Sequence, residues 1–282
     1  MIYLNGRFVA IEDASISVLD RGFIFGDGVY ELVPVYSRKP FRLGEHLQRL
    51  QHSLDAIRLA NPHSDAEWRD LIALVVAQQS FDDQSVYLHI TRGVAKRDHA
   101  FPAADTPPTV LMMANPLVTP STEQIENGVA AVTAVDNRWL RCDIKATSLL
   151  SNVLLRQLAV DAGAAETILL RGGFMTEGAA SNIFVVKDEI IFAPPKNSLM
   201  LPGITYDVVV ELAAQNAVEC RIGAVPERLL RNADEIWQTS STREVLAVTT
   251  LDGEPVGDGR PGLLGQRMLE WYQAYKTNVM RV

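Results

Sequence analysis

Lys145 and Glu177 are the residues of this sequence whose types and surroundings could most directly do chemistry. Lys145 ends the run 138–145, where several neighbours are apolar. An ammonium is costly to bury there, so the lysine is paired, deprotonated or covalently changed. A Schiff base with an aldehyde cofactor is one such change. A carboxylate in a later glycine-containing turn, Glu177, could then pair with a protonated ring nitrogen of that cofactor. Spacing alone proves neither role, since most lysines are solvated.

Four segments carry a resemblance to a known family, namely residues 25–31, 138–145, 177–182 and 201–205. In order and spacing they are similar to motifs of the pyridoxal-phosphate aminotransferases of fold type IV, and most similar to the D-amino-acid members. The similarity runs from Met1 to about Lys276. It implies a small N-terminal α/β domain and a larger, barrel-like C-terminal α/β domain, with pyridoxal 5'-phosphate between them.

Bulk composition excludes several classes of protein. A chain of 282 residues suits one large or two medium domains with hydrophobic cores. Its net charge, 26 − 34 = −8, argues against nucleic acid as a partner. Cys142 and Cys220 are too few for a disulfide framework, which favours a reducing cytoplasm. With no basic leader and no long apolar run, we expect a soluble protein that does not bind membranes.

The first part of the chain predicts a mixture of strands and helices. Residues 2–4 and 7–9 flank Asn5-Gly6 and predict a hairpin. Leu47, Leu50, Leu54 and Ile57 recur at helical spacing, and Ser64 to Glu67 predicts a capping box that starts a helix to about Gln79. Alternation over 86–91 predicts a strand, and residues 109–113 predict another.

We expect the domain boundary near residue 120, giving domains 1–120 and 121–282, because residues 115–120 contain two prolines and precede a capping box at Ser121. Beyond it the sequence predicts strands at Val129–Val135 and near Thr167, Ile183, Ile190, Ala217 and Ile236, and helices over 149–162, 206–215 and 262–276. Without strict βαβ alternation, this pattern indicates an α/β or α+β class and no more.

The resemblance assigns roles to Lys145 and Glu177. Lys145 would hold the cofactor as a Schiff base, be displaced by the substrate amine, and then move the proton between the substrate Cα and the cofactor. Glu177 would keep the ring nitrogen protonated, since a nearby carboxylate raises the pKa of a cationic partner. The alternatives for these residues are a salt-bridged surface lysine and an ordinary turn carboxylate.

The phosphate of the cofactor needs positive charge and N–H donors. Residues 203–205, just before a helix expected near Tyr206, would present N–H groups at a helix N-terminus. Arg49 resembles the phosphate arginine of the family, and Ser241 and Thr242 could add contacts. The predicted cofactor-binding residues are Lys145, Glu177, Arg49, Leu201, Ile204, Thr205, Ser241 and Thr242. Leu201 would pack on the ring, although a core leucine would look the same.

Substrate recognition is expected from Tyr30, Arg97 and His99. The segment 91–102 resembles the Arg-x-His element with which D-amino-acid members hold a substrate carboxylate, and a guanidinium can grip a carboxylate in a fork. In those members the element enters the active site of the neighbouring subunit, which implies a homodimer with composite sites. Without the resemblance, a solvated basic loop would be an equal reading of Arg97 and His99.

Two departures from the family pattern concern the pocket. Ala179 and Ala180 stand where many D-amino-acid members have hydroxyl side chains, which affects expectations about substrate breadth and cofactor affinity. Pro34 lies on an expected strand, where a proline lacks the ladder donor and suggests an edge position. Residues 26–28 are not a dinucleotide fingerprint, because the third glycine is absent. The histidines show no metal-ligand spacing, so we expect no metal.

The sequence thus predicts a cytoplasmic, homodimeric aminotransferase that moves the amino group of a D-amino acid, expected to be D-alanine, to 2-oxoglutarate or pyruvate by a ping-pong mechanism. The alternatives on the same fold are a branched-chain L-amino-acid or (R)-amine transaminase, since fold alone does not choose a substrate, and an aminodeoxychorismate lyase. A protein that carries the cofactor without catalysis is a further alternative. The element at Arg97 and His99 favours the D-amino-acid interpretation.

Overall fold

The computed structural model describes residues 1–282, and the chain groups into two compact units. The N-terminal unit comprises Met1–Leu117, Ile144–Leu149 and Met280–Val282, and the C-terminal unit comprises Val118–Asp143 and Leu150–Val279. The division into domains 1–120 and 121–282 stays a prediction. The two compact units differ from these predicted domains in the segment Ile144–Leu149, which belongs to the N-terminal unit. This difference concerns function, because the segment contains Lys145.

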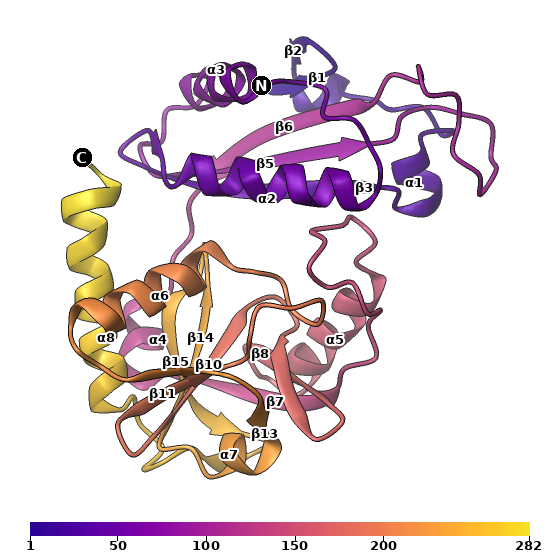
Figure 1. The fold of residues 1–282 in the computed structure, drawn as a ribbon. Coiled ribbons are helices and arrows are strands. Elements are labelled where there is room, and N and C mark those ends of the chain that lie inside the picture. The colour runs from indigo at the N-terminus through magenta and orange to yellow at the C-terminus, as the bar shows by residue number, and fades with distance from the viewer. The chain divides into compact units, whose positions relative to one another are not determined.

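The N-terminal unit is built on a six-stranded antiparallel sheet with the strand order β2-β1-β6-β5-β3-β4 (Figure 1). The strands are β1 (Ile2–Leu4), β2 (Arg7–Val9), β3 (Gly28–Tyr36), β4 (Lys39–Pro40), β5 (Gln84–Thr91) and β6 (Thr109–Pro116). The helices are η1 (Ile11–Asp13), α1 (Arg21–Phe25), α2 (Leu43–Ala56) and α3 (Asp65–Ala77). The predicted hairpin is confirmed, with Asn5 and Gly6 both at positive φ.

Helices α2 and α3 cover one face of this sheet and form a single hydrophobic core with it. Side chains of β3 and β5 alternate between the two faces, so every second residue joins the core. The core includes Val29, Val33, Leu50, Leu54, Trp68, Ile72, Val86, Leu88 and Ile90. Tyr30, Tyr87 and His89 point to the other face and are half-buried. The predicted alternation of β5 is therefore confirmed.

The C-terminal unit is built on a ten-stranded mixed sheet with the order β12-β11-β10-β14-β15-β7-β8-β9-β13, and β16 pairs with β15. The strands are β7 (Val129–Val135), β8 (Glu166–Arg171), β9 (Phe174–Gly178), β10 (Asn182–Lys187), β11 (Ile190–Ala193), β12 (Cys220–Ile222), β13 (Val225–Pro226), β14 (Glu235–Ser240), β15 (Glu244–Leu251) and β16 (Glu254–Pro255). The helices are α4 (Thr122–Asn127), α5 (Leu150–Asp161), α6 (Ile204–Gln215), α7 (Glu227–Arg231) and α8 (Leu263–Tyr275), and the π-helix η2 (Lys276–Met280) follows.

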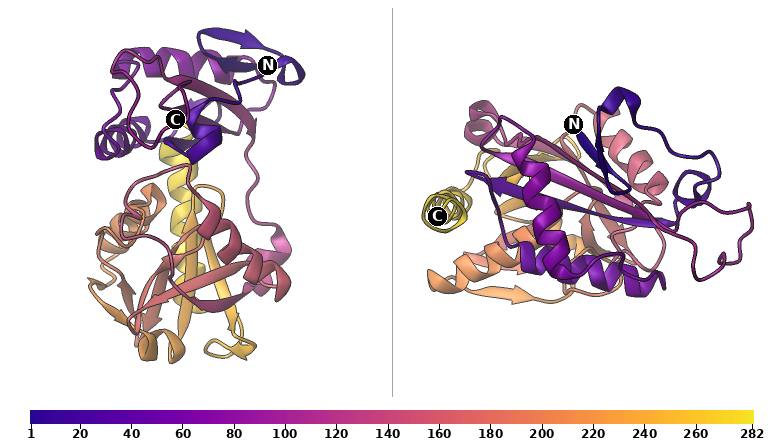
Figure 2. Two further views of the ribbon diagram at one scale, coloured as in Figure 1. Left: turned by 90° about the vertical axis from the view of Figure 1, so that its right-hand side faces the viewer. Right: turned by 90° about the horizontal axis from the view of Figure 1, so that it is seen from above.

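The sheet of the C-terminal unit curls because strands far apart in its order meet again. β9 and β10 are not neighbours in the order, yet the N–H of Gly178 donates to the carbonyl of Ser181 at 2.7 Å and joins their ends. The curled sheet encloses a core that includes Ile168, Ile183 and Ile236. Figure 2 shows α8, in yellow, running alongside this unit's sheet. The predicted fold class, a mixed α/β protein with a barrel-like second sheet, is confirmed.

Most predicted elements are confirmed, and the differences have local causes. The helix expected from Tyr206 begins at Ile204 with Gly203 as its N-cap, and the strand expected near Ala217 begins at Cys220 because Ala217 adopts a positive φ after α6. The expected linker over 115–120 overlaps the end of β6, which continues to Pro116. Both predicted capping boxes form, at Ser64 and at Ser121.

Pro34 lies in β3 with its backbone facing away from β5. Its carbonyl accepts from the N–H of Phe41 at 2.8 Å, and in an antiparallel ladder the two polar backbone groups of a residue point to the same side. The missing donor of Pro34 therefore faces the outer side of β3 and interrupts no bond to β5.

The sequence predicts neither a membrane-spanning segment nor a metal site. No helix combines the length and apolar character needed to cross a membrane. No three His, Cys, Asp or Glu side chains gather in a way that could hold a metal ion.

Candidate active site

Lys145 is positioned by backbone pairing with the outer edge of β3. The N–H of Tyr30 donates to the Lys145 carbonyl at 2.9 Å, and the N–H of Thr147 donates to the Gly28 carbonyl at 3.0 Å. This pairing places the Lys145 Nζ 4.3 Å from the centre of the Tyr30 ring. An ammonium over an aromatic face is favourable, and it holds the amine beside a phenol. The structure thus brings two predicted site residues together, Lys145 and Tyr30.

Arg49 is held by Glu31 on the core face of β3. Its Nε and Nη2 donate to the two Glu31 carboxylate oxygens at 2.7 and 2.8 Å, and His46 Nδ1 lies 2.8 Å from Oε2. His46 and Arg49 are one turn apart on α2, so both face the strand. The fixed guanidinium remains a candidate for an anion, and its phosphate role stays a prediction.

The buried carboxylate of Glu31 and the imidazole of His46 have displaced pKa values. Burial raises the pKa of Glu31, but Arg49 and His46 outweigh it and hold the pKa well below its usual range. Burial lowers the pKa of His46 in spite of Glu31, so the imidazole is neutral. The Nε2 atom of this buried histidine has no hydrogen-bond partner in the protein.

The loop with Arg97 and His99, between β5 and β6, is anchored by a carboxylate that sequence reasoning missed. Asp27 accepts from Arg21 Nε at 2.8 Å and from Arg92 Nε and Nη2 at 2.8 and 3.0 Å. Arg21 Nη1 in turn donates to the carbonyls of Asp98 and Ala100 at 2.7 and 3.2 Å. Asp27 therefore fixes the loop through Arg21. The sequence feature that could have indicated this anchor is the carboxylate of Asp27 within the motif 25–31.

Arg97 and His99 are exposed and lie around one aromatic ring. Phe25 is 5.4 Å from the His99 ring and 5.5 Å from the Arg97 guanidinium. No hydrogen bond, ion pair or ring contact joins Arg97 or His99 to Tyr30 or Lys145 within this chain. The proposed carboxylate-binding group is therefore incomplete in a single N-terminal unit.

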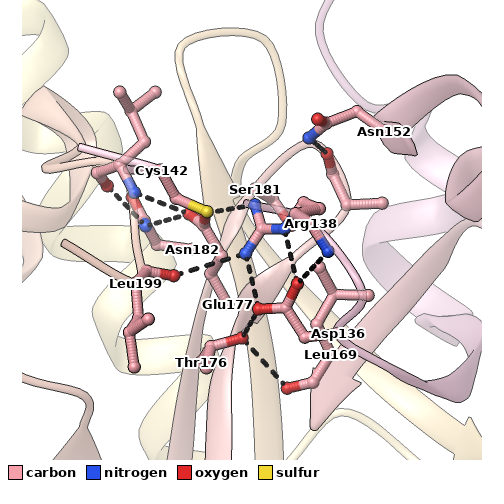
Figure 3. Close-up of polar contacts among 12 residues, drawn as sticks. Asp136, Arg138, Cys142, Asn152, Leu169, Thr176, Glu177, Ser181, Asn182 and Leu199 are labelled. Atoms are coloured by element: carbon pink, nitrogen blue, oxygen red, sulfur yellow. Dashed lines mark hydrogen bonds and ion pairs between the residues drawn. The ribbon is translucent and has the colours of Figure 1, made fainter. Parts of the chain in front are cut away.

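Glu177 is buried at the end of β9 in the C-terminal unit (Figure 3). Its Oε1 accepts from Arg138 Nη1 at 2.6 Å, and its Oε2 accepts from the Leu201 N–H at 3.1 Å and Asn182 Nδ2 at 3.3 Å. A carboxylate has about four acceptor positions, so Oε1 has room for one further donor. Burial raises the pKa of Glu177 to about 7, although Arg138 and the Leu201 N–H lower it. A cation bound at Oε1 would favour the ionised form.

Asp136 and Arg138, at the end of β7, complete the surroundings of Glu177. Arg138 binds both oxygens of Asp136, at 2.9 and 3.0 Å. Asp136 also accepts from Thr176 Oγ1 at 2.9 Å and pairs with Arg171 at 3.0 Å. Burial raises the pKa of Asp136, but Arg138 and Arg171 bring it down to about 2. No role was predicted for either residue. The available signal was an Asp-x-Arg pair directly after an apolar strand.

The N-terminus of α6 presents backbone N–H donors. It lies beside Asn182, which donates to Glu177. The first intrahelical bond is donated by Asp207 to the Gly203 carbonyl, so the N–H groups of Ile204 and Thr205 precede the helical ladder. Such an end attracts anions. Gly203 leaves room for Asn182 here, because a Cβ would lie 2.0 Å from Asn182 Oδ1 and that side chain would have to move. The same Asn182 donates to the Leu201 carbonyl at 2.9 Å and links this turn to Glu177.

Ser241 and Thr242 lie in the turn between β14 and β15. Thr242 Oγ1 is 3.5 Å from Ser240 Oγ, and Ser240 Oγ accepts from the Arg243 N–H at 3.1 Å. Both predicted residues are half-buried. No hydrogen bond connects them to the start of α6, so their joint role in binding phosphate stays a prediction.

Ala179 and Ala180 lie in the turn between β9 and β10. The Ala179 N–H donates to Glu166 Oε1 at 3.1 Å, and its carbonyl accepts from Asn152 Nδ2 at 2.9 Å. Burial raises the pKa of Glu166, a carboxyl that also accepts from Ser181 Oγ at 2.6 Å. The backbone of this turn is thus fixed by partners that do not involve the missing hydroxyls.

Comparison with known proteins finds aminotransferases both by family model and by sequence identity. A family model described as amino-transferase class IV matches residues 28–251. The chain is 41% identical to the D-alanine aminotransferase of Bacillus licheniformis over 263 residues, covering 93% of this chain and 92% of that protein. It is 39% identical to the D-alanine aminotransferase of Staphylococcus aureus (strain MW2) over 274 residues, covering 97% of each.

Among solved structures, the chain resembles the branched-chain amino acid aminotransferase of Escherichia coli. The TM-score is 0.88 at 30% sequence identity, and the match covers 95% of this chain and 92% of that one. The family model and both relatives span most of the chain, including the segments with Lys145 and Glu177. The chain therefore belongs to the class IV aminotransferases, which have fold type IV.

Proposed function

We propose that this chain is a pyridoxal-phosphate-dependent D-amino-acid aminotransferase. It moves the amino group of a D-amino acid, with D-alanine as the expected donor, to 2-oxoglutarate or pyruvate in a ping-pong reaction. The observation that carries this assignment is the identity of 39 to 41% to D-alanine aminotransferases over nearly the whole chain. The Arg97-x-His99 element supports the same donor class.

Lys145 is the proposed catalytic residue. When bound, pyridoxal phosphate supplies an aldehyde for a Schiff base with an amine and a ring that withdraws electrons. Lys145 supplies that amine and afterwards carries the proton from the substrate Cα. Its backbone pairing with β3 and its position over the Tyr30 ring keep the amine in one place, which general acid-base work requires.

Glu177 and the start of α6 are the proposed binding groups for the ring nitrogen and the phosphate. Glu177 has an acceptor position left on Oε1, and its buried carboxylate favours a protonated ring nitrogen. Ile204 and Thr205 offer N–H donors at the N-terminus of α6. Arg49, Ser241 and Thr242 complete the phosphate site, and Leu201 packs on the ring. The donor set fits the cofactor's charges.

The proposed substrate-binding residues are Tyr30, Arg97 and His99. In a homodimer, Tyr30 would come from one subunit, and Arg97 and His99 would come from the neighbouring subunit. Arg97 and His99 are exposed on their own unit and make no contact with Tyr30, which supports their use by a second copy. The exposed apolar face of α5 supports dimerisation, since apolar stripes of this kind mark interfaces. That face comprises Leu150, Val153, Leu154 and Leu158. We place the dimer in the cytoplasm, with no nucleic acid or membrane partner.

The experiment that tests this assignment is a half-reaction with the cofactor-loaded protein. D-alanine should remove the visible absorption band of the bound cofactor, and 2-oxoglutarate should restore it. Loss of the band with L-leucine but not with D-alanine would instead support a branched-chain aminotransferase. That is the second candidate, since the structural relative described above carries that name. Release of pyruvate beyond one equivalent per bound cofactor, without an acceptor, would indicate a lyase.

A further inference from the structure

We propose that Arg138 is a positioning residue for Glu177, holding its carboxylate ionised and oriented for the ring nitrogen of the cofactor, with Asp136 as the anchor of Arg138. The inference rests on the proposed function, because it deepens the role of Glu177 there. It assigns a task to a buried arginine and a buried aspartate to which the sequence motifs gave none.

Arg138 joins the carboxylates of Asp136 and Glu177 by hydrogen bonds (Figure 3). Arg138 donates from Nη1 to Glu177 Oε1 at 2.6 Å and from Nε and Nη2 to the two oxygens of Asp136 at 2.9 and 3.0 Å. The exposed fractions of the Arg138, Glu177 and Asp136 side chains are 4%, 6% and 0%. Buried pairs of this kind are little screened by water, so removing the guanidinium will be felt at Glu177.

Asp136 keeps the guanidinium from moving. It accepts from Thr176 Oγ1 at 2.9 Å and from the Arg138 N–H at 3.1 Å, and it pairs with Arg171 at 3.0 Å. Arg138 Nη2 also donates to the Leu199 carbonyl at 3.3 Å. A planar fork fixed at one end by a bidentate carboxylate points its remaining donors in a set direction. The direction of Nη1 is toward Glu177.

The charges leave Glu177 available for a cation. Asp136 takes two of the three ionic hydrogen bonds of Arg138, although Asp136 also pairs with Arg171. Glu177 is therefore only partly neutralised, and Oε1 keeps one acceptor position. The carboxylate of Glu177, when ionised, therefore favours a protonated ring nitrogen beside Oε1.

The other groups that face Glu177 do not replace Arg138. Leu201 N–H and Asn182 Nδ2 are neutral donors, and Asp136 raises the pKa of Glu177 by repulsion. The Cys142 thiol, whose pKa burial raises to about 11, is neutral near pH 7. Arg138 is thus the cation that opposes the effect of burial on Glu177.

The test is a pH titration of cofactor-free protein labelled with ¹³C at the glutamate side-chain carboxyl, followed by NMR. Glu177→Gln assigns the signal. In Arg138→Met the titration midpoint of Glu177 should rise by about one unit or more, the effect of removing a close opposite charge. Arg171→Met is the matched control, because Arg171 pairs with Asp136 and makes no hydrogen bond or ion pair with Glu177. Its midpoint should move by less than about half a unit.

A second variant keeps the test decisive if Arg138→Met does not fold. Arg138→Met leaves Asp136 buried with reduced pairing, so Asp136→Asn/Arg138→Gln removes both charges together. The Glu177 midpoint should still rise, since the lowering by Arg138 exceeds the raising by Asp136. An unchanged midpoint in whichever variant folds overturns the proposal. Failure of both variants to fold would make the role of Arg138 structural and would overturn it as well.

The result of the NMR titration does not depend on whether the proposed aminotransferase function is correct. The NMR titration uses neither cofactor nor turnover, so an unmoved midpoint removes the task of Arg138 and leaves the aminotransferase assignment standing. Conversely, a loaded wild-type protein that transfers no amino group from any D-amino acid removes the assignment, whatever the titration shows. With the cofactor bound, Arg138→Met should also shift the pH profile of the visible absorption band, and Arg171→Met should not.

Discussion

Glu177 is a carboxyl group buried where its ionised form is costly, with Arg138 as compensation. In the unfolded chain it ionises near its ordinary pKa of 4.5, whereas in the folded chain the pKa is about 7. Between these values the folded state binds more protons than the unfolded state, so stability falls as pH rises through this window.

This sign predicts the behaviour of Glu177→Gln without cofactor. Between pH 5 and pH 8 the wild type should lose on the order of 2 kcal/mol of unfolding free energy relative to the variant, because Gln cannot ionise. Urea unfolding at both pH values measures the difference. A variant that loses as much stability as the wild type would show that Glu177 titrates normally.

Lys145 is the proposed catalytic residue, so we expect turnover to depend on it. Lys145→Ala should lower kcat at least about 10³-fold, because one side chain performs covalent and proton-transfer work. Lys187→Ala is the control, since that lysine is half-buried in another part of the chain and pairs with Asp234 at 2.6 Å. Steady-state kinetics with D-alanine measure both. Retention of turnover in Lys145→Ala would end the mechanism.

Among the elements, the loop between β5 and β6 depends on Asp27 for its anchor, through Arg21 and Arg92. Asp27→Asn weakens two ion pairs at once, so the loop with Arg97 and His99 should become less ordered. We expect the KM for D-alanine to rise about tenfold, the effect of about 1.4 kcal/mol, with a smaller change in kcat.

Asp105→Asn is the matched control for the loop. It makes the same change of charge in the same loop, and Asp105 is exposed and makes no contact with Arg21 or Arg92. Equal rises in KM for both variants would mean that charge, and not anchoring, is responsible.

The start of α6 depends on close packing between Gly203 and Asn182. In Gly203→Ala the new Cβ would lie 2.0 Å from Asn182 Oδ1, so Asn182 must move and its bonds to Glu177 and Leu201 are disturbed. Cofactor affinity should fall about tenfold, the loss of about one hydrogen bond to a charged group. Fluorescence titration with pyridoxal phosphate measures it. Gly223→Ala, whose Cβ would meet nothing within 4 Å, should bind normally.

At the scale of the whole molecule, the proposed active site needs two copies of the chain. The exposed leucines of α5 are the expected contact, and a charge placed there costs desolvation. Leu154→Arg should therefore yield monomers in sedimentation at micromolar concentration, with amino transfer reduced. Leu74→Arg, at another exposed leucine on α3, should leave the wild-type state unchanged. A monomeric and fully active Leu154→Arg variant would contradict composite sites.

Local signals in the sequence determined the elements. The spacing of Leu47, Leu50 and Leu54 predicted α2, alternation predicted β5, and the boxes at Ser64 and Ser121 predicted two helix starts. These succeed because hydrophobic period and capping are properties of neighbouring residues. Motifs at residues 138–145 and 177–182 selected Lys145 and Glu177.

Only the tertiary structure decided which charges share a site. Asp136 and Arg138 follow β7, while Glu177 lies at the end of β9, and the sheet brings Arg138 Nη1 within 2.6 Å of Glu177 Oε1. In the same way, the chain must fold before Asp27 can meet Arg92, or Glu31 can meet Arg49. A buried ion pair between distant residues leaves no periodic trace in sequence, because each partner alone resembles a solvated surface charge. The pairing, and with it the task of Arg138, exists only once the sheets are formed.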